Sequence, residues 1–130
     1  MTIAAMVALV LLSTFIAPAF AFTEYLRTHA RRYGGNDVVN YAWGVSGSAN
    51  YKIRFQCATG PHIGRLYAVT SGFSNGVSGV GTILAGVINS GCAINQLQGT
   101  STFVVIELQL IAYPISGGVV KVVTVFTFSK

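Results

Sequence analysis

The chain has 130 residues, which is room for one domain of ordinary size and a short additional segment. Hydrophobic residues make up 52% of it and charged residues only 8%, against roughly 25% in typical soluble domains. The formal net charge of +5 arises because there are only three Asp and Glu residues against eight Lys and Arg. Eight Lys and Arg residues are too few to form the dense basic face that phosphate recognition requires. Nucleic acid is therefore not the expected partner.

The first 23 residues carry no charge and read MTIAAMVALVLLSTFIAPAFAFT. About 20 apolar residues can span the hydrocarbon core of a bilayer as a helix. A secretory signal peptide is the alternative, because Ala19-Phe20-Ala21 is a small-x-small cleavage site. No Lys or Arg precedes that site, however, and the apolar run is longer than the usual one. We therefore expect a retained helix, with a signal peptide ending near Ala21 as the alternative.

The apolar pattern continues beyond this uncharged segment with a helical period. Between Phe22 and Tyr33, the residues of one helix face recur at i, i+3, i+4, i+7, i+8 and i+11. Gly34-Gly35 then gives a helix stop. The pattern predicts one helix over residues 1–33, about 50 Å long. The residues expected to pack this helix against the following domain are Phe22, Tyr25, Leu26, His29 and Tyr33.

Small residues in the uncharged segment would let copies of the helix approach one another closely. Ala4 and Ala8, like Ala17 and Ala21, form small-xxx-small pairs. Pro18 removes one helical hydrogen bond and should bend the helix. The expected core-packing positions in a bundle of such helices are Ile3, Ala4, Ala8, Leu11, Leu12, Phe15, Ala17 and Ala21.

Residues 34–130 have the pattern of an all-β sandwich or barrel. Gly and Ser separate short runs that are rich in Val, Ile, Thr, Tyr and Phe. Apolar and polar residues alternate over residues 51–57, which predicts a half-buried strand. The last runs are apolar on both faces and therefore need a covering layer. Further strands are expected over residues 66–70 and 81–88, and a hairpin over residues 102–112 and 119–128.

The strand over residues 51–57 carries basic and aromatic residues side by side. They are Tyr51, Lys52, Arg54 and Phe55. Such a mixture could contact DNA or a surface. An ordinary strand with one charged face explains it equally well.

Cys57 and Cys92 are the only cysteines. Two cysteines in an exported β domain favour one disulfide, worth about 3–4 kcal/mol in the chain-entropy model. A metal site is the weaker interpretation, because His29 and His62 share no ligand spacing with the cysteines. Unpaired buried thiols remain the other alternative.

The residue inventory argues against an enzyme. Acid–base and nucleophilic hydrolysis need a pair of carboxylates, or a nucleophile beside an oriented base. The only acids are Glu24, Asp37 and Glu107, which are spread along the chain. The glycines over residues 71–81 lack the Lys-Ser/Thr that follows a phosphate-binding loop. We therefore expect no catalytic residues, no metal and no cofactor.

The layout resembles the mature subunit of a type IV pilus or a related type IV filament. Such subunits have an uncharged N-terminal helix that carries a proline, turns amphipathic and enters a small β-rich head. Bacterial type IV pilins usually have Phe at the first mature position and Glu at the fifth, where this chain has Met1 and Ala5. Archaeal pilins commonly have wholly apolar N-termini and immunoglobulin-like heads, so the archaeal type is the better match. The resemblance implies an α+β chain with a filament-core helix over residues 1–33 and an immunoglobulin-like sandwich over residues 34–130.

The resemblance also implies a function, that of a structural subunit in an extracellular filament for adhesion or surface contact. The partners would be identical subunits, with the cytoplasmic membrane holding the helix before assembly. A prepilin peptidase that removes a basic leader and an assembly motor are implied as well. The alternative is a secreted or membrane-anchored β-sandwich binding module with a signal peptide ending near Ala21. A third possibility is a filament formed by strand exchange between β subunits after signal removal.

Overall fold

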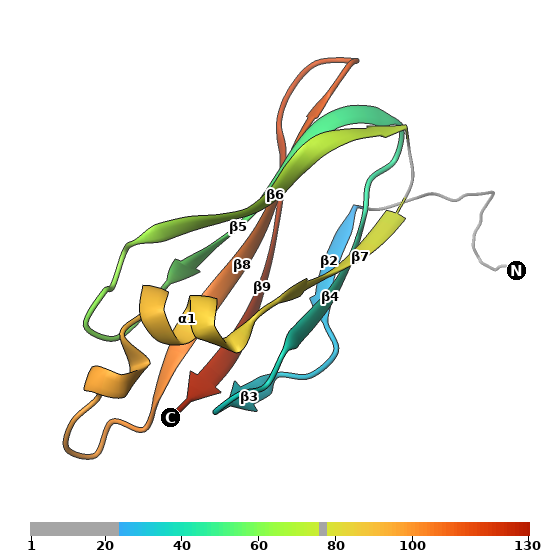
Figure 1. Ribbon diagram of the computed structural model, residues 1–130. Helices are drawn as coiled ribbons and strands as arrows, with labels where there is room; N and C mark the ends of the chain where they lie inside the picture. Colours follow the sequence, from blue (N-terminus) through green and yellow to red (C-terminus); the bar gives the residue numbers. More distant parts are fainter. Residues whose placement is uncertain (1–23, 76–77) are drawn as a thin grey trace, which may run out of the picture.

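Most of the described residues lie in strands that form two facing sheets. The computed structural model of the chain describes residues 24–75 and 78–130. One sheet has three strands in the order β2-β4-β7, and the other has five in the order β3-β9-β8-β5-β6 (Figure 1). The elements are β2 (Tyr25–Thr28), β3 (Arg32–Gly34), β4 (Val39–Gly44), β5 (Ser48–Cys57), β6 (Leu66–Asn75), β7 (Ser78–Ile83), α1 (Ala85–Gly91), the 3-10 turn η1 (Ile94–Gln96), β8 (Phe103–Pro114) and β9 (Val120–Ser129).

The structure contradicts the predicted α+β fold with a long N-terminal helix. Residues 25–28 form β2 and residues 32–34 form β3, so the amphipathic part of the predicted helix consists of strands. The described residues are mostly β and contain one short α-helix. The rest of the predicted helix, residues 1–23, lies outside the described residues.

The spacing of Tyr25, Leu26 and Tyr33 is the reason that the helix prediction was wrong. Over so short a run, apolar residues fit a helix or a strand, and periodicity alone does not separate the two. In β2, Leu26 is buried while the next residue, Arg27, is exposed, which is the two-residue period of a strand. Leu26 lies opposite Trp43 in the antiparallel ladder with β4. This ladder satisfies backbone groups that a helix would have satisfied internally.

The five-stranded sheet is built around the predicted hairpin. β8 and β9 pair antiparallel without interruption from Phe103 to Ala112, which confirms that hairpin. β5 pairs with the other side of β8, and β6 pairs with β5. The ladder between β5 and β6 has a bulge between Ile53 and Arg54. β3 completes the sheet by pairing parallel with β9.

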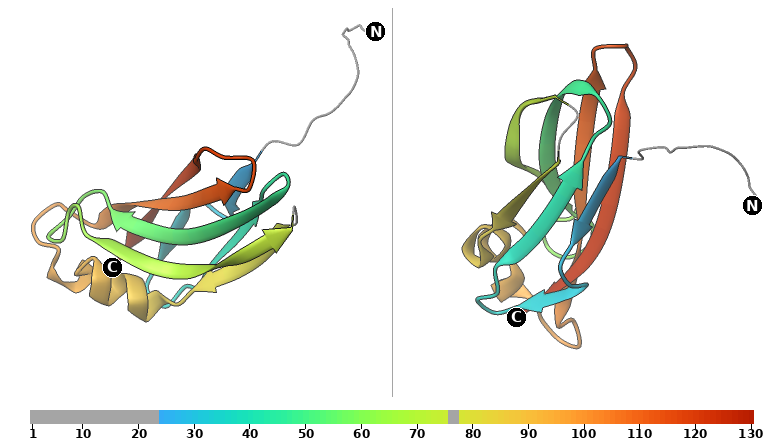
Figure 2. Two further views of the ribbon diagram at one scale, coloured as in Figure 1. Left: turned by 90° about the horizontal axis from the view of Figure 1, so that it is seen from above. Right: turned by 90° about the vertical axis from the view of Figure 1, so that its right-hand side faces the viewer.

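The chain passes several times from one sheet to the other (Figure 2). β2 and β4 belong to the three-stranded sheet, whereas β3, between them in the chain, belongs to the five-stranded sheet. β6 and β7 are likewise consecutive strands in different sheets, and each lies at the edge of its sheet. β2 packs beside β9, so the two sheets approach each other along that side.

The apolar core lies between the two sheets. Trp43 of β4 stacks on Tyr51 of β5 with ring centroids 4.4 Å apart, which ties the sheets together. Phe55 stacks on Tyr67 within the five-stranded sheet at 5.1 Å. Each fully buried large apolar side chain contributes about 1.5–3 kcal/mol. The largest of them include Phe55, Phe126, Phe128, Ile53, Ile88, Ile94, Ile106, Leu108, Leu110, Val39 and Val104.

The strand expected over residues 81–88 is only partly present. β7 ends at Ile83, and α1 begins at Ala85. The buried residues of α1 are Ala85, Ile88 and Gly91. Their spacing of three residues is helical. The helix has only about two turns, so this pattern was too short to be recognised in the sequence.

Candidate functional site

The two cysteines form a buried disulfide, as predicted. Cys57 ends β5 and Cys92 follows α1, and their Cα atoms are 5.7 Å apart. Neither residue is exposed to solvent. The bond closes a loop with a sequence separation of 35 residues. It therefore holds α1 against the five-stranded sheet and leaves no accessible sulfur among the described residues.

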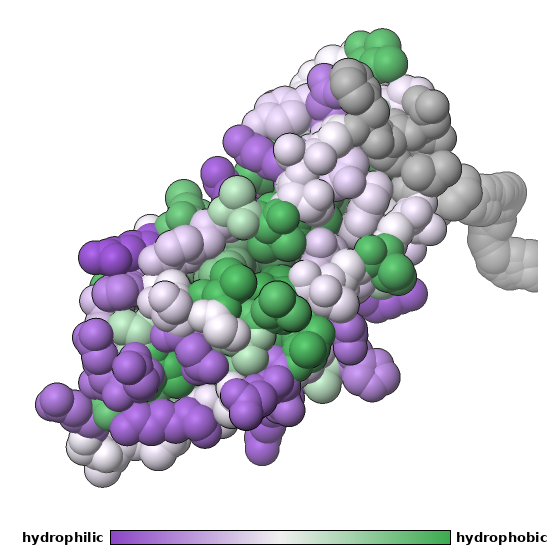
Figure 3. Space-filling model, in the orientation of Figure 1, coloured by the Kyte–Doolittle hydropathy of each residue, from purple (hydrophilic) through white to green (hydrophobic). Residues whose placement is uncertain are grey.

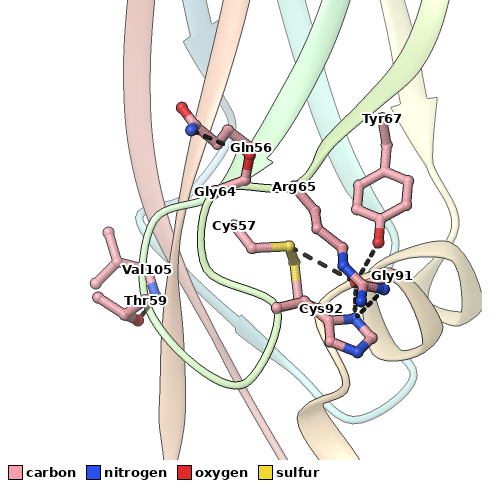
Figure 4. The surroundings of a disulfide bond; sticks show 10 residues. Gln56, Cys57, Thr59, Gly64, Arg65, Tyr67, Gly91, Cys92 and Val105 are labelled. Carbon is pink, nitrogen blue, oxygen red and sulfur yellow. Dashed lines mark hydrogen bonds between the residues drawn. A yellow bond between two sulfur atoms is a disulfide. The ribbon is translucent and has the colours of Figure 1, made fainter.

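The last carbonyl of α1 is the centre of a polar cluster beside this disulfide (Figure 4). The Tyr67 hydroxyl donates to the Gly91 oxygen at 2.6 Å, and His62 Nδ1 lies 2.6 Å from the same oxygen. Because a carbonyl only accepts, Nδ1 carries the proton and donates it. Arg65 Nη1, 3.4 Å from that nitrogen, then has no acceptor there. The cluster satisfies an end of the helix, which is a structural role.

The outer face of the five-stranded sheet carries a second polar cluster, centred on Gln109. Gln109 is only 2% exposed and is the one buried polar residue among those described. Arg54 Nε donates to its Oε1 at 2.7 Å, and its Nε2 donates to Glu107 Oε1 at 2.6 Å. The reverse orientation of the amide would turn its donor toward the guanidinium and its acceptor toward the carboxylate. We call this set the Arg54–Gln109–Glu107 network.

Beside this network, the surface of the five-stranded sheet is hollowed over β5 and β6. The hollow has a volume of about 480 Å³. We call it the β5–β6 depression; it is lined by Lys52, Ile53, Arg54, Leu66, Tyr67, Ala68, Val69, Thr70 and Ser71. Lys52 and Arg54 supply its charge, and the Lys52 ammonium lies 5.9 Å from the centre of the Tyr113 ring. The bulge in the ladder between β5 and β6 lies here, with Val69 of β6 as the extra residue between the pairs Ile53–Thr70 and Arg54–Ala68.

The aromatic residues of β5 point away from its cations. Tyr51 stacks on Trp43 in the core, and Phe55 is fully buried. β5 therefore has one charged face and one face that packs in the core. The aromatic platform that single-stranded nucleic acid requires is not formed by β5.

The outer face of the three-stranded sheet has a larger depression of about 580 Å³. Arg27, Ala42 and Val80 lie in one row across the three strands, with Asn40 and Thr82 in another. The Arg27 guanidinium is stacked over the Tyr25 ring at 4.7 Å. The depression is lined by Arg27, Thr28, His29, Asn40, Tyr41, Ala42, Val80, Gly81 and Thr82.

Exposed apolar side chains add to the surface around β7 and α1. Figure 3 shows apolar residues gathered across the middle of the face on which these two elements lie in Figure 1. The contributors from this part of the chain include Leu84 and Val87, and Val80 is 83% exposed. Singly exposed apolar residues are ordinary, but a group of them indicates a contact surface.

The three carboxylates lie apart, and each accepts from an uncharged donor. Glu24 accepts from the Ser46 hydroxyl at 2.5 Å, and Asp37 accepts from the Gly34 N–H at 2.9 Å. The Ser46 hydroxyl lowers the pKa of the Glu24 carboxyl from its ordinary value. Glu107 belongs to the network above. The described residues contain no group of three or more His, Cys, Asp or Glu side chains that could hold a metal ion.

The predicted helix–head residues that are described do not share one face. Leu26 is buried in the core, whereas Tyr25 lies over Gly44 on the outer face of the three-stranded sheet. Tyr33 packs edge-on against Phe126, with ring centroids 5.5 Å apart. The remaining predicted sites lie outside the described residues: Ile3, Ala4, Ala8, Leu11, Leu12, Phe15, Ala17, Pro18, Ala21 and Phe22.

Gln109 was missed in the sequence, although a signal was present. Residues 103–112 are otherwise apolar, and their two polar residues, Glu107 and Gln109, are two positions apart. Residues with that spacing share a face of a strand. Its partner Arg54 lies 55 positions earlier, so the pairing itself required the fold.

Two further results bear on the site. Over residues 24–75 and 78–130, no helix is long and apolar enough to cross a bilayer. No known protein family matches the sequence, and no curated protein matches it either.

Proposed function

We propose that the chain is an exported β-sandwich module, secreted or membrane-anchored, that acts by surface binding and not by catalysis. The observation that carries this proposal is the position of β2. The sandwich begins at Tyr25, directly after the uncharged segment and its Ala19-Phe20-Ala21 site. The filament-core helix was predicted to continue to residue 33, but strands occupy residues 25–28 and 32–34.

Two other features support this proposal. A buried disulfide is typical of proteins that mature in an oxidising compartment outside the cytosol. The carboxylates Glu24, Asp37 and Glu107 are separate and engaged with neutral donors, which does not suit acid–base chemistry. Depressions on the outer faces of both sheets offer surfaces for a ligand instead.

The mature N-terminus tests the proposal. The full-length chain is expressed with a C-terminal tag in an export-competent host, and the medium, membrane and cytoplasm are separated. We expect a disulfide-bonded product outside the cytoplasm that starts at or near Phe22. Ala21→Tyr should block cleavage because the position before the cut must be small, whereas Phe20→Tyr, at the tolerant middle position, should not.

Retention of the whole chain in the cytoplasm, with Cys57 and Cys92 reduced, would refute export. An uncleaved product held in the membrane fraction with its disulfide formed supports the anchored form of the module.

A structural subunit of an extracellular filament is the second candidate function. It is favoured by the edge strands: β6 (LYAVTSGFSN) and β7 (SGVGTI) contain no charged residue and no proline. Charges and prolines on edge strands normally prevent sheets from pairing with other chains. In this candidate the partners are identical subunits, and the uncharged segment over residues 1–21 is a second element through which they could assemble.

Electron microscopy of the purified exported protein tests this candidate. If the N-terminal segment drives assembly, Ala8→Glu should abolish filaments while the sandwich stays folded. If edge pairing drives assembly, Ser71→Lys on β6 should abolish them instead. A protein that stays monomeric at high concentration, both in buffer with salt and in buffer without detergent, would eliminate the filament candidate.

A further inference from the structure

We infer that the β5–β6 depression binds the carboxylate or sulfate groups of an acidic glycan. The inference rests on the proposed function, because it assigns a ligand class to the binding module. Lys52 and Arg54 are the charged residues that line the depression, and none of the described lining residues is acidic. Two residues apart on one strand, they are spaced about 7 Å along it. That spacing suits repeated anionic groups on a polymer.

Arg54 is held ready for such a group. Its Nε is fixed by Gln109 Oε1 at 2.7 Å, so the plane of the guanidinium is set. The two Nη groups remain to form the paired hydrogen bonds that guanidinium makes with a planar carboxylate or with sulfate. A guanidinium ordered before binding loses less conformational entropy when the ligand arrives.

The burial of Gln109 is explained by this role. A buried amide is costly unless both its ends are satisfied. Here the Glu107 carboxylate orients the amide and the amide orients Arg54. Gln109 is therefore a positioning residue for the cation and does not itself meet the ligand. It also separates Glu107 from the guanidinium, so that the positive charge is not neutralised by a direct ion pair.

The rest of the depression fits a saccharide better than a nucleic acid. Ser71, opposite Lys52, supplies a hydroxyl group, and Leu66 and Ala68 supply apolar contacts. The volume of about 480 Å³ exceeds that of a single inorganic anion and leaves room for sugar rings. Stacking of successive bases needs several aromatic faces beside the cations. Among the described residues, Tyr113 lies beside Lys52, but Phe55 of β5 is buried in the core.

Binding measurements on the purified exported chain test the inference. The probes are polygalacturonate for carboxylates, heparin for sulfates, dextran as a neutral glycan and single-stranded DNA as a different polyanion. Arg54→Gln should weaken glycan binding by about tenfold or more, because it removes a charged hydrogen-bond donor. Arg32→Gln, at the exposed first position of β3, changes the net charge equally and should weaken binding by less than about twofold.

Glu107→Val distinguishes the positioning of Arg54 through Gln109 from simple charge attraction of the ligand. This substitution removes a negative charge beside the depression, so charge attraction alone predicts tighter binding. Loss of the acceptor that orients Gln109 predicts weaker binding, which is the expected result. Arg54→Lys should restore only part of the affinity, since lysine lacks the planar fork. Thermal unfolding of each variant checks that the sandwich is intact.

Equal losses for Arg54→Gln and Arg32→Gln would overturn the inference, as would tighter binding by Glu107→Val. Stronger binding to DNA than to either acidic glycan would overturn it too. So would binding of the acidic glycans that is no stronger than binding of dextran. Each of these outcomes leaves the export test untouched, because that test reads the N-terminus and location of the chain. Failure of export would remove the extracellular setting without changing the affinities of the purified protein.

Discussion

Two glycines of β7 show how single residues fix the packing of the three-stranded sheet. Gly79 and Gly81 lie opposite Trp43 and Tyr41 in the ladder with β4. A Cβ atom at Gly79 would lie 2.8 Å from Trp43 Nε1, and one at Gly81 would meet the Tyr41 hydroxyl. The aromatic rings thus cover the glycine backbone, a device known to stabilise glycines in strands. The absence of these two side chains is what allows the rings to lie flat between the sheets.

Replacing Gly81 with alanine should therefore destabilise the sandwich. The added methyl group overpacks the Tyr41 ring, and we expect a loss of about 1–3 kcal/mol in the free energy of unfolding. Urea denaturation measures it. Gly86→Ala in α1 is the matched control, because nothing lies within 4 Å of its Cβ. That control should be neutral or stabilising by up to about 1 kcal/mol, and an equal loss in both variants would argue against the packing explanation.

The Glu24–Ser46 pair predicts a small dependence of stability on pH. The Ser46 hydroxyl lowers the pKa of Glu24 in the folded state, so the pair stabilises the fold above the unfolded pKa. This contribution is lost as the pH falls through the folded pKa. Ser46→Ala should therefore cost under about 1 kcal/mol at pH 7, since the pair is on the surface. The gap to the unmodified protein should close in acid.

Denaturant titrations at pH 7 and at pH 2–3 would show this convergence. Ser101→Ala, in the exposed loop before β8, serves as the comparison and should show no such pH-dependent gap. A constant gap for Ser46→Ala at all pH values would indicate a cause other than the carboxylate.

At the scale of elements, α1 depends on the disulfide more than on its own length. It has only seven residues and no side-chain cap at its N-terminus. Helices this short are not stable by themselves in water. Cys92 joins its end to β5, and the Gly91 carbonyl accepts from Tyr67 of β6. The helix is thus positioned by the sheet and in turn closes the core there through Ile88.

Removal of the disulfide should be the most damaging change at this scale. Cys57→Ala with Cys92→Ala should lower the free energy of unfolding by about 3–4 kcal/mol, as expected for a loop of this size. Guanidinium denaturation measures the loss. Adding reductant should destabilise the unmodified protein similarly and leave the double variant unchanged. Any effect of reductant on the double variant would show that another process is being observed.

The sequence predicted those elements whose signals are long and local. The strand over residues 51–57 and the hairpin of β8 and β9 have clear alternation or long apolar runs, and both are present. Residues 25–33 were misassigned because a short apolar run fits two periods, and tertiary pairing with β4 decided between them. The Arg54–Gln109 bond depends on the register of β5 against β8, which no local pattern encodes.

At the scale of the whole molecule, the five-stranded sheet joins distant parts of the chain. β9 lies between β3 and β8, and its pairing with β3 links Tyr33 to Phe128. Phe126 and Phe128 are both buried in the core. β9 therefore supplies the pairing partner for two strands as well as part of the core, although it follows every other described strand in sequence.

A chain shortened at Ser116, without β9, should consequently fail to fold cooperatively. It would leave β3 and one side of β8 unpaired and would lack both buried phenylalanines. Near-ultraviolet circular dichroism should show no fixed aromatic packing, and hydrophobic dye binding should rise. Removing only Lys130, whose ammonium bonds to the Leu97 carbonyl at 2.7 Å, should leave a folded protein. A cooperative unfolding transition in the shortened chain would contradict this dependence on β9.

The place of β9 also bears on the timing of the proposed export. Contacts between residues far apart in sequence form late and slowly, since a long loop must close first. Because β9 pairs with both β3 and β8, the sandwich cannot be completed until the chain has been made through Ser129. Under the proposed export, a polypeptide that cannot complete its fold before β9 is made stays unfolded during synthesis, and it can pass through a translocation channel in that state.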